Sequence, residues 1–582
     1  MKNQRLENMK SLNDILYQKL KISMMKNNLK YMILVAMVLL MGSCGKDFLT
    51  VNPVDKLVAD NFYSNETQVR QGTASLYGAV WFDFNDQLFW TAGDCMSGNM
   101  YHTWDQQGQF FYFSYTEGNA YINSGFNCLY KVISYANSLI NDMPKAAGGK
   151  VSQDVINRAI GEARFMRGTA FFILAEFWGD VPLVENSTAL VSSNNMTLPK
   201  NTKSSVYEFV RRDLQFAADN LPASDVPGRV TKWSAKGMLA KLYLTMAQNV
   251  SDANSATNFT NAKNLADDVI TNSGLSLVKN YADLFNVTND NNPESLFAFQ
   301  FMSGNYGIGN SNQAQWARSS TITGNTEAWG GGKSVTYDIK YMIDSTANFK
   351  NDARRSAIYM QDGDYYPDIN KANGGYHYKI VSYDPNDNTK VLENAAPLLN
   401  SLKKYIVGSA ADYPGLVSVN QATAINKYVL RLADVYLIYA EAALGAQAST
   451  SDAVALSRLN AIRSRASLAP LSSISFMDIF NERRIEFCLE GISWFDVKRY
   501  YYRNPSAALS YLNNQKRAYT LNRISPVTAT TPAADKAAGY VLTQNSPITV
   551  DASKMVLPIP GALVLQQPQL AKDQPAVDYV FQ

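Results

Sequence analysis

Histidine and cysteine are scarce in this 582-residue sequence. It has two histidines, His102 and His377, and four cysteines. A zinc site built on histidines or a Ser-His-Asp triad is excluded unless one of these two histidines serves, and we expect both to be ordinary surface or loop residues. The cysteines beyond position 44 are Cys95, Cys128 and Cys488, an odd number without metal-ligand spacing. We therefore expect no metal site and no cofactor.

Beyond residue 43 the sequence has no excess of basic residues, although its formal net charge is +3. Residues 1–43 carry seven Lys and Arg and two acids, so the rest of the chain has 46 basic and 48 acidic residues. A nearly neutral chain lacks the excess of positive charge that binding to a phosphate backbone requires. Nucleic acid is therefore not expected as a partner.

The apolar run near the N-terminus is short. Residues 31–41 are eleven apolar residues, fewer than the roughly 20 that a membrane-spanning helix needs. The run follows the basic segment 24–30 and precedes LMGSC (40–44), which has the form of a bacterial lipobox. We expect residues 1–43 to be a signal peptide, of which residues 1–23 are a doubtful N-terminal extension, and Cys44 to become a diacylated N-terminus. A signal cut elsewhere and an uncleaved anchor are the alternatives.

Apolar residues at three- and four-residue intervals predict helices on both sides of a loop-rich middle. The predicted helices are 65–81, 127–143, 157–184 (ending before Gly179), 205–222, 231–248, 261–272, 426–447, 451–466 and 475–491. Residues 295–301 read as a strand, and the Gly-, Asn- and Asp-rich stretch to about 425 predicts loops with short strands. Small residues around an aromatic, such as Ala433 and Ala440 around Tyr436, are typical of tetratricopeptide-like helix pairs. The expected fold is mainly α, a helix-pair scaffold with long loop-rich insertions and a few short strands.

Five blocks of sequence resemble the SusD/RagB family of nutrient-binding outer-membrane lipoproteins of Bacteroidetes. They are CGKDFLTVNP (44–53), FMRGTAFFILAEFWGDVPLV (165–184), VLRLADVYLIYAEAAL (429–444), NERRIEFCLEGISWFDVKRY (481–500) and MVLPIPGALVLQQPQL (555–570). In the last block QPQL (567–570) stands where the family usually has Asn-Pro-Asn-Leu. The resemblance implies an N-terminal SusD-like helical part (44–290) and a C-terminal RagB/SusD part (291–582), packed into one compact unit.

The resemblance also implies a location and partners. It predicts a lipoprotein that is anchored in the outer membrane through Cys44 and faces the cell exterior. It implies an oligosaccharide as the usual cargo, peptides in some members, and a SusC-like TonB-dependent β-barrel transporter as the partner.

Glutamates on the predicted helix 475–491 invite an enzymatic interpretation, because paired carboxylates can hydrolyse glycosides. Glu482, Glu486 and Glu490 are four residues apart on one stripe, with Arg483 and Arg484 beside them. One stripe does not flank a substrate from two sides, so we expect a structural ion-pair network. The Asp-rich loop 362–370 could hold calcium, but it lacks EF-hand spacing.

Two loop regions combine aromatic and polar residues in the way that saccharides require, since a flat ring covers a sugar face and polar side chains bond its hydroxyls. They span residues 93–113 and 304–337. The candidate glycan-binding residues are Asp94, Asn99, Tyr101, Trp104, Tyr306, Trp316 and Trp329. For each aromatic, local packing is the alternative. Trp81, Trp178, Trp233 and Trp494 are assigned to the core.

Together these observations predict a non-catalytic, cell-surface lipoprotein that captures an oligosaccharide and delivers it to a SusC-like transporter. A peptide-binding member of the same family is one alternative. A surface-anchored glycoside hydrolase is another.

Overall fold

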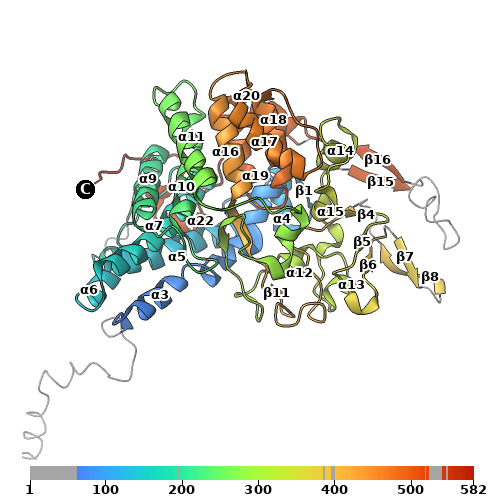
Figure 1. The fold of residues 1–582 in the computed structure, drawn as a ribbon, viewed down its shortest axis with the longest axis horizontal. Helices are drawn as coiled ribbons and strands as arrows, with labels where there is room; N and C mark the ends of the chain where they lie inside the picture. The colour runs from blue at the N-terminus through green and yellow to red at the C-terminus, as the bar shows by residue number, and fades with distance from the viewer. Residues whose placement is uncertain are drawn as a thin grey trace, which may run out of the picture. The chain divides into compact units, whose positions relative to one another are not determined.

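The computed structural model describes residues 62–193, 197–379, 381–384, 387–394, 400–517, 519–523, 540–544 and 548–581. The chain divides into a unit of residues Met1–Phe62 and a unit of residues Tyr63–Gln582. The signal segment and Cys44 belong to the first unit and lie outside the described residues. All elements below belong to the second unit (Figure 1).

Long helices with polar caps fill the first half of this unit. The side chains of Asn119, Ser152 and Thr202 accept backbone N–H groups at the starts of α5, α7 and α9, as N-cap residues do. Every residue from 165 to 178 is buried, so α7 is a central helix. It ends at Gly179, whose positive φ of 77° favours glycine. The helices here are α3 (Glu66–Ala74), α4 (Asp105–Tyr112), α5 (Ala120–Asn141), α6 (Met143–Ala147), α7 (Gln153–Trp178), α8 (Ser187–Ser192), α9 (Lys203–Asn220), α10 (Lys232–Ala247) and α11 (Ser255–Asn272).

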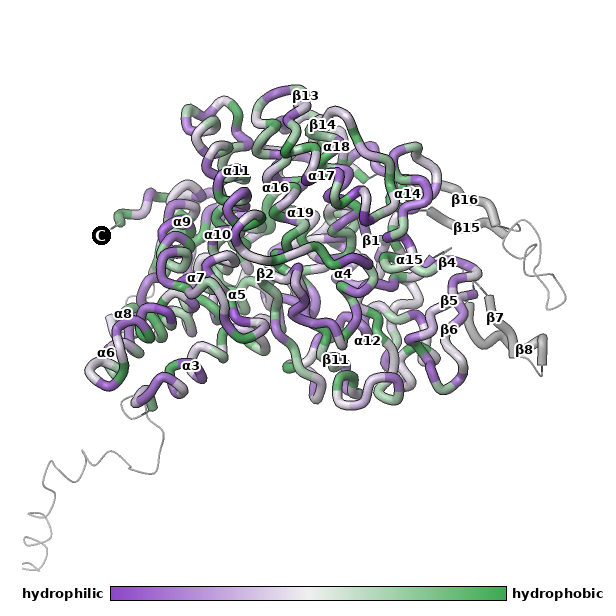
Figure 2. Tube along the Cα trace, in the orientation of Figure 1, coloured by the Kyte–Doolittle hydropathy of each residue, from purple (hydrophilic) through white to green (hydrophobic). Residues whose placement is uncertain are grey.

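The C-terminal helices continue the same row of packed helices. They are α16 (Leu432–Leu444), α17 (Ala453–Arg465), α18 (Phe476–Glu486), α19 (Ser493–Arg503), α20 (Pro505–Asn513) and α22 (Gly561–Gln566). In space α7 packs on α5 and α9, α10 on α9 and α11, and α16 on α11 and α17 (Figure 1). Figure 2 shows that hydrophobic residues gather along inner helices such as α16, whereas α3 is largely hydrophilic. The mainly helical, tetratricopeptide-like fold predicted from the sequence is confirmed.

Between these helix sets the chain forms short elements and long loops. Its helices are α12 (Asn312–Trp316), α13 (Ser320–Thr323), α14 (Tyr337–Ser345) and α15 (Arg355–Ile358). The strands of the described unit pair antiparallel, two by two. They are β1 (Met100–Tyr101) with β3 (Ser334–Val335), β2 (Ser295–Phe299) with β12 (Lys427–Arg431), β4 (Tyr359–Gln361) with β9 (Asn400–Leu402), β5 (Tyr365–Tyr366) with β6 (Tyr376–His377), β7 (Val381–Asp384) with β8 (Asp387–Asn394), β10 (Val417–Ser418) with β11 (Ala422–Thr423), β13 (Ser449–Thr450) with β14 (Ile474–Ser475), and β15 (Tyr519–Arg523) with β16 (Tyr540–Gln544).

Several predicted helices differ from the structure at their ends. The predicted helices 127–143 and 261–272 begin earlier in the structure, at Ala120 and Ser255. The predicted helix 426–447 begins only at Leu432, because Lys427–Arg431 is a fully buried strand that pairs with β2. The predicted helix 65–81 ends at Ala74 and resumes as a 3₁₀ turn at Ala79–Trp81. Helix α18 starts at the predicted capping box of Ser475 and Asp478 and stops at Glu486, before residue 491.

The glutamates of the 482–490 stripe lie inside the protein in ion pairs. Glu482 pairs with Arg354 at 2.7 Å and with Arg463 at 3.0 Å. Glu486 lies 2.6 Å from Arg431, and Glu490 lies 2.8 Å from the same arginine. All three carboxylates are at least 99% buried. The predicted structural ion-pair network is therefore confirmed.

The residues assigned to the core are also buried. Trp81, Trp178, Trp233 and Trp494 each expose 7% or less of their surface. The three cysteines beyond position 44 are buried free thiols. Within the described ranges, no group of His, Cys, Asp and Glu could hold a metal ion. None of the described helices is both long and apolar enough to span a bilayer.

Candidate functional site

The two loop regions that the sequence selects lie side by side. Strand β1 of the first region pairs with β3 of the second, with Met100 opposite Val335. The backbone N–H of Thr336 donates to the carbonyl oxygen of Asn99 at 3.0 Å. Gly332 lies beneath the indole of Trp104, since a Cβ there would be 3.4 Å from two ring carbons. The pairing of β1 with β3 therefore joins both regions into one surface.

Two tryptophans are exposed on this surface. Trp104 exposes 67% of its surface and Trp329 exposes 47%. Trp104 is the N-cap residue of α4, and Trp329 precedes the 3₁₀ turn Gly330–Gly332, whose last glycine touches Trp104. The backbone N–H of Trp329 donates to the carbonyl of Ala314 in α12 at 2.9 Å. Hydrogen-bonded backbone thus presents two indole rings to solvent.

Tyr306 adds a third exposed ring, of which 52% is accessible. Its hydroxyl donates to the Asp86 carboxylate at 2.8 Å, and its ring packs edge-on against Phe82 at 4.7 Å between centroids. Burial and the Asp86 charge raise the pKa of Tyr306 above its usual range. The phenol is therefore fixed as a neutral donor to Asp86 while its ring remains open to solvent.

Polar side chains connect Tyr306 with Trp104. Next to Asp86, the amide of Gln87 accepts a hydrogen bond from Gln107 in the first turn of α4. Asp105 follows Trp104 directly and lies 3.4 Å from the hydroxyl of Tyr121. This strip offers donors and acceptors between flat rings. We name the set of Trp104, Trp329, Tyr306 and this strip the aromatic surface.

Three of the predicted ligand residues are buried and have internal partners. Asp94 accepts backbone N–H groups of Leu489 and Gly491 at 2.9 and 2.8 Å. Asn99 accepts from Arg484 Nε at 3.0 Å and donates to the Ser493 hydroxyl at 2.8 Å.

Trp316 has no exposed surface and packs between Trp90 and Tyr405, with centroids 6.1 and 6.0 Å away. The expectation that Asp94, Asn99 and Trp316 contact a ligand is corrected, because their side chains are enclosed by protein. Tyr101 is intermediate. It is partly buried, and its ring packs edge-on against Phe111 at 5.3 Å.

His102 lies in a loop between β1 and α4, which is one of the two expected placements, but it is buried and not at the surface. Only 3% of it is exposed, and neither ring nitrogen has a hydrogen-bond partner among the described residues. Burial lowers the pKa of His102 to about 3. Nearby, the ammonium group of Lys333 donates to the carbonyl oxygens of Gln315 and Trp329, at 2.9 and 3.3 Å. Lys333 thus ties the loop of Trp329 to α12, beside the neutral imidazole of His102.

Sequence analysis did not identify Asp86, Gln87, Gln107 or Tyr121. Asp86 lies in the π-helical turn Phe84–Leu88, inside an aromatic-rich stretch that is otherwise core. An acid that is buried in such an apolar stretch needs a hydrogen-bonding partner, and that is the signal that could have found Asp86.

Two family models together match residues 47–575 of the chain. A model of the SusD family matches residues 239–575, and a model described as starch-binding associating with outer membrane matches residues 47–244. The matches overlap inside α10, whereas the sequence predicts a division near residue 290, which stays a prediction.

Relatives and solved structures agree over nearly full length. A SusD-like protein of Bacteroides ovatus is 33% identical over 565 residues, covering 95% of this chain and 98% of that protein. SusD-like protein P2 of Formosa agariphila is 26% identical, covering 79% and 89%. A crystal structure with xylogluco-oligosaccharide is 32% identical with a TM-score of 0.76, covering 88% of this chain and 99% of that one. A laminarin-binding SusD-like protein shares the fold, at 22% identity and a TM-score of 0.61, covering 88% and 98%. On these matches, the chain belongs to the SusD family.

Proposed function

We propose that the protein binds an oligosaccharide on the aromatic surface and does not cleave it. The observation that carries this proposal is the pair of exposed indoles, Trp104 and Trp329, which two separate loops hold on one side of the protein. The relative that was crystallised with xylogluco-oligosaccharide supports the same ligand class.

The chemistry of the surface suits a neutral sugar chain. Apolar C–H faces of sugar rings stack on Trp104, Trp329 and Tyr306. Hydroxyl groups then reach the accessible polar side chains of the strip between them, such as Gln87 and Asp105. Each aromatic contact buries apolar area without burying a charge, so binding needs no cation or cofactor.

Binding without hydrolysis is favoured by where the carboxylates lie. A glycosidase needs two carboxyl groups that flank the scissile bond. Glu482, Glu486 and Glu490 are enclosed in ion pairs. On the aromatic surface, Asp86 is buried and accepts hydrogen bonds from Tyr306 and Ser311.

The test is calorimetric titration of the full-length protein with xyloglucan-derived and laminarin-derived oligosaccharides. Trp104→Ala and Trp329→Ala should each raise the Kd at least about tenfold, a loss of about 1.4 kcal/mol. Tyr135→Ala is the matched control, because Tyr135 is also an exposed aromatic (44%) but lies on α5, outside the aromatic surface. Equal Kd values for the wild type and both tryptophan variants, or shortened oligosaccharides after incubation, would contradict the proposal.

We also propose the cellular setting. The protein is anchored through a lipid on Cys44 to the outer membrane, faces the exterior, and passes its ligand to a SusC-like TonB-dependent transporter. Support comes from membership of the family and from the matched model described as associating with outer membrane. Co-purification of such a transporter with the tagged protein from native membranes tests the partnership.

A further inference from the structure

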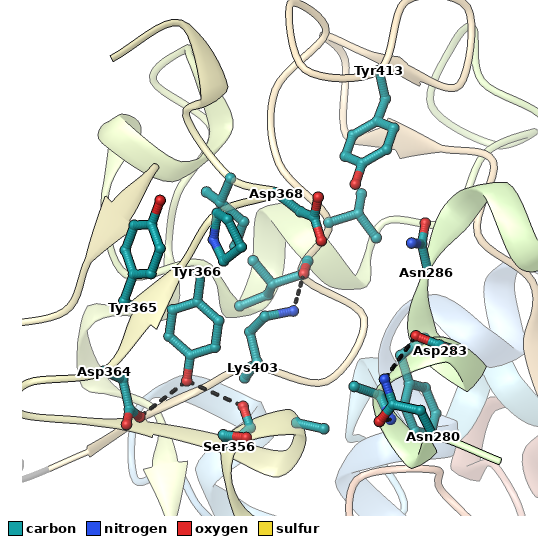
Figure 3. A pocket seen from close by; sticks show the side chains of 17 residues that line it. Asn280, Asp283, Asn286, Ser356, Asp364, Tyr365, Tyr366, Asp368, Lys403 and Tyr413 are labelled. Atoms are coloured by element: carbon teal, nitrogen blue, oxygen red, sulfur yellow. Dashed lines mark hydrogen bonds between the residues drawn. The ribbon is translucent and has the colours of Figure 1, made fainter. Parts of the chain in front are cut away.

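A cavity lies apart from the aromatic surface. Its walls are the 3₁₀ turn Tyr281–Phe285, the β5–β6 hairpin and the loop 403–413, and its volume is about 260 Å³ (Figure 3). Trp104, Tyr306 and Trp329 do not line it. The cavity is therefore a separate feature of the protein.

Three different hydrogen-bonding groups converge on this cavity. The carboxylate of Asp368 influences both Lys403 and Tyr413 electrostatically, and Figure 3 shows the Asp368 carboxylate and the Tyr413 hydroxyl directed toward the same space. The Lys403 ammonium donates one hydrogen bond, to the carbonyl of Ile406 at 2.7 Å, and a lysine ammonium has three donors. Within the described part of the chain, no hydrogen bond occupies the side chain of Asp368. An acceptor, a donor and a phenol are thus available together.

The rest of the cavity is apolar and aromatic. The buried side chains of Phe285, Ile406 and Val407 line it. Tyr365, which is half exposed, contributes a ring that is held by stacking on His377 at 4.5 Å between centroids. A ligand with an apolar face and several hydroxyl groups would satisfy both kinds of lining.

The charged residues that line the cavity and its volume limit the kinds of ligand that it could bind. Asp283 and Asp368 both line the cavity and disfavour an anion, while Lys403 opposes a cation. Burial lowers the pKa of Lys403 to about 8, so it remains a donor at neutral pH. A volume of about 260 Å³ is below the roughly 300 Å³ at which pockets for drug-sized ligands begin, which suits one ring and not a chain.

We propose that this cavity is a second binding site, for a single uncharged sugar unit held by Asp368, Lys403 and Tyr413. It would act independently of the aromatic surface, either on a free monosaccharide or on one branch of a larger glycan. The proposal therefore does not rest on the oligosaccharide site.

The experiment uses the full-length protein with Trp104→Ala and Trp329→Ala combined, so that the aromatic surface is disabled. Saturation-transfer NMR with D-glucose, D-galactose and D-xylose at millimolar concentration should give signals for at least one sugar. Adding Asp368→Ala or Tyr413→Phe should raise the Kd at least fivefold. Asp573→Asn, an exposed acid outside the cavity, should leave the Kd within twofold.

Circular dichroism of each variant shows whether the fold is kept, and Tyr413→Phe keeps the ring in place if Asp368→Ala perturbs the loop. The proposal is overturned if none of the three sugars gives a signal or if both cavity variants bind as well as their parent. It is also overturned if only charged sugars, glucosamine or glucuronate, bind.

Discussion

Arg431 is the hub of the buried ion network, and its removal should destabilise the protein strongly. Its guanidinium contacts three carboxylates, at 2.7 Å for Glu294, 2.6 Å for Glu486 and 2.8 Å for Glu490. Burial alone would raise the pKa of Glu486, but Arg465, Arg431 and Arg354 hold it well below its usual range. Arg431→Met keeps much of the side-chain length and removes the charge.

The expected loss of stability follows from the ion pairs that remain in the Arg431→Met variant. Each carboxylate keeps at least one other cation, such as Lys404 for Glu490 at 3.1 Å and Arg354 for Glu486 at 2.8 Å. The loss is therefore that of one partner in a buried cluster. Removing one partner of a buried pair costs about 3–5 kcal/mol. This is a large part of the roughly 5–15 kcal/mol that stabilises a typical fold.

Urea titration followed by circular dichroism measures the effect. Arg158→Met is the matched control, because Arg158 pairs with Asp154 on the surface, where the side chains are 41% and 66% exposed, and such pairs contribute about 0–1 kcal/mol. A loss below about 1 kcal/mol for Arg431→Met, or equal losses for both variants, would refute the structural role assigned to these carboxylates.

Three further predictions concern His102, the Trp329 loop and the lipid anchor. Because burial holds the folded-state pKa of His102 near 3 against an ordinary 6.5, the unfolded chain binds a proton that the folded one does not. The free energy of unfolding should therefore fall by up to about 1.4 kcal/mol per pH unit as the pH drops below 6.5. In urea titrations at pH 6.5 and 4.5, His102→Gln should lose less stability between the two pH values than the wild type. Equal losses in the two proteins would exclude a contribution of His102 to the pH dependence. A Cβ on Gly330 would overlap a backbone carbonyl of α12, whereas a Cβ on Gly331 would meet only the Arg318 carbonyl oxygen, at 4.0 Å. Gly330→Ala should therefore displace Trp329 and weaken oligosaccharide binding several-fold by calorimetry, while Gly331→Ala should not. Cys44→Ala should abolish incorporation of radiolabelled palmitate and release the protein from membranes, and retained label would rule out the lipobox.

The sequence predicts helices well where one face is apolar, and less well where tertiary pairing decides. The 157–184 pattern ends at Gly179 in the structure as predicted, because a glycine with positive φ terminates α7. By contrast, Lys427–Arg431 has the periodicity of the helix that follows it. It becomes a strand because β2 is available for pairing, and the sequence of β12 alone does not reveal that partner.

The candidate site shows the same limit at the level of single side chains. Trp104 and Trp316 both lie in polar, glycine-rich surroundings, yet one is 67% exposed and the other is fully buried. Composition identifies a loop but not the direction of each ring. That direction is set by long-range contacts, such as the packing of Trp316 on Tyr405.

The buried residues mistaken for ligand contacts explain why the aromatic surface can be rigid. Asp94 and Asn99 fasten the base of the first loop to the segment 484–493, part of the block that carries the resemblance to the family. Because the loop is ordered before a ligand arrives, binding does not have to supply the entropy cost of ordering it. The ion-paired segment around Glu486 therefore supports the loop that carries the exposed indole of Trp104. Buried ion pairs fix this segment, and the segment in turn fixes the backbone on which the ring stands.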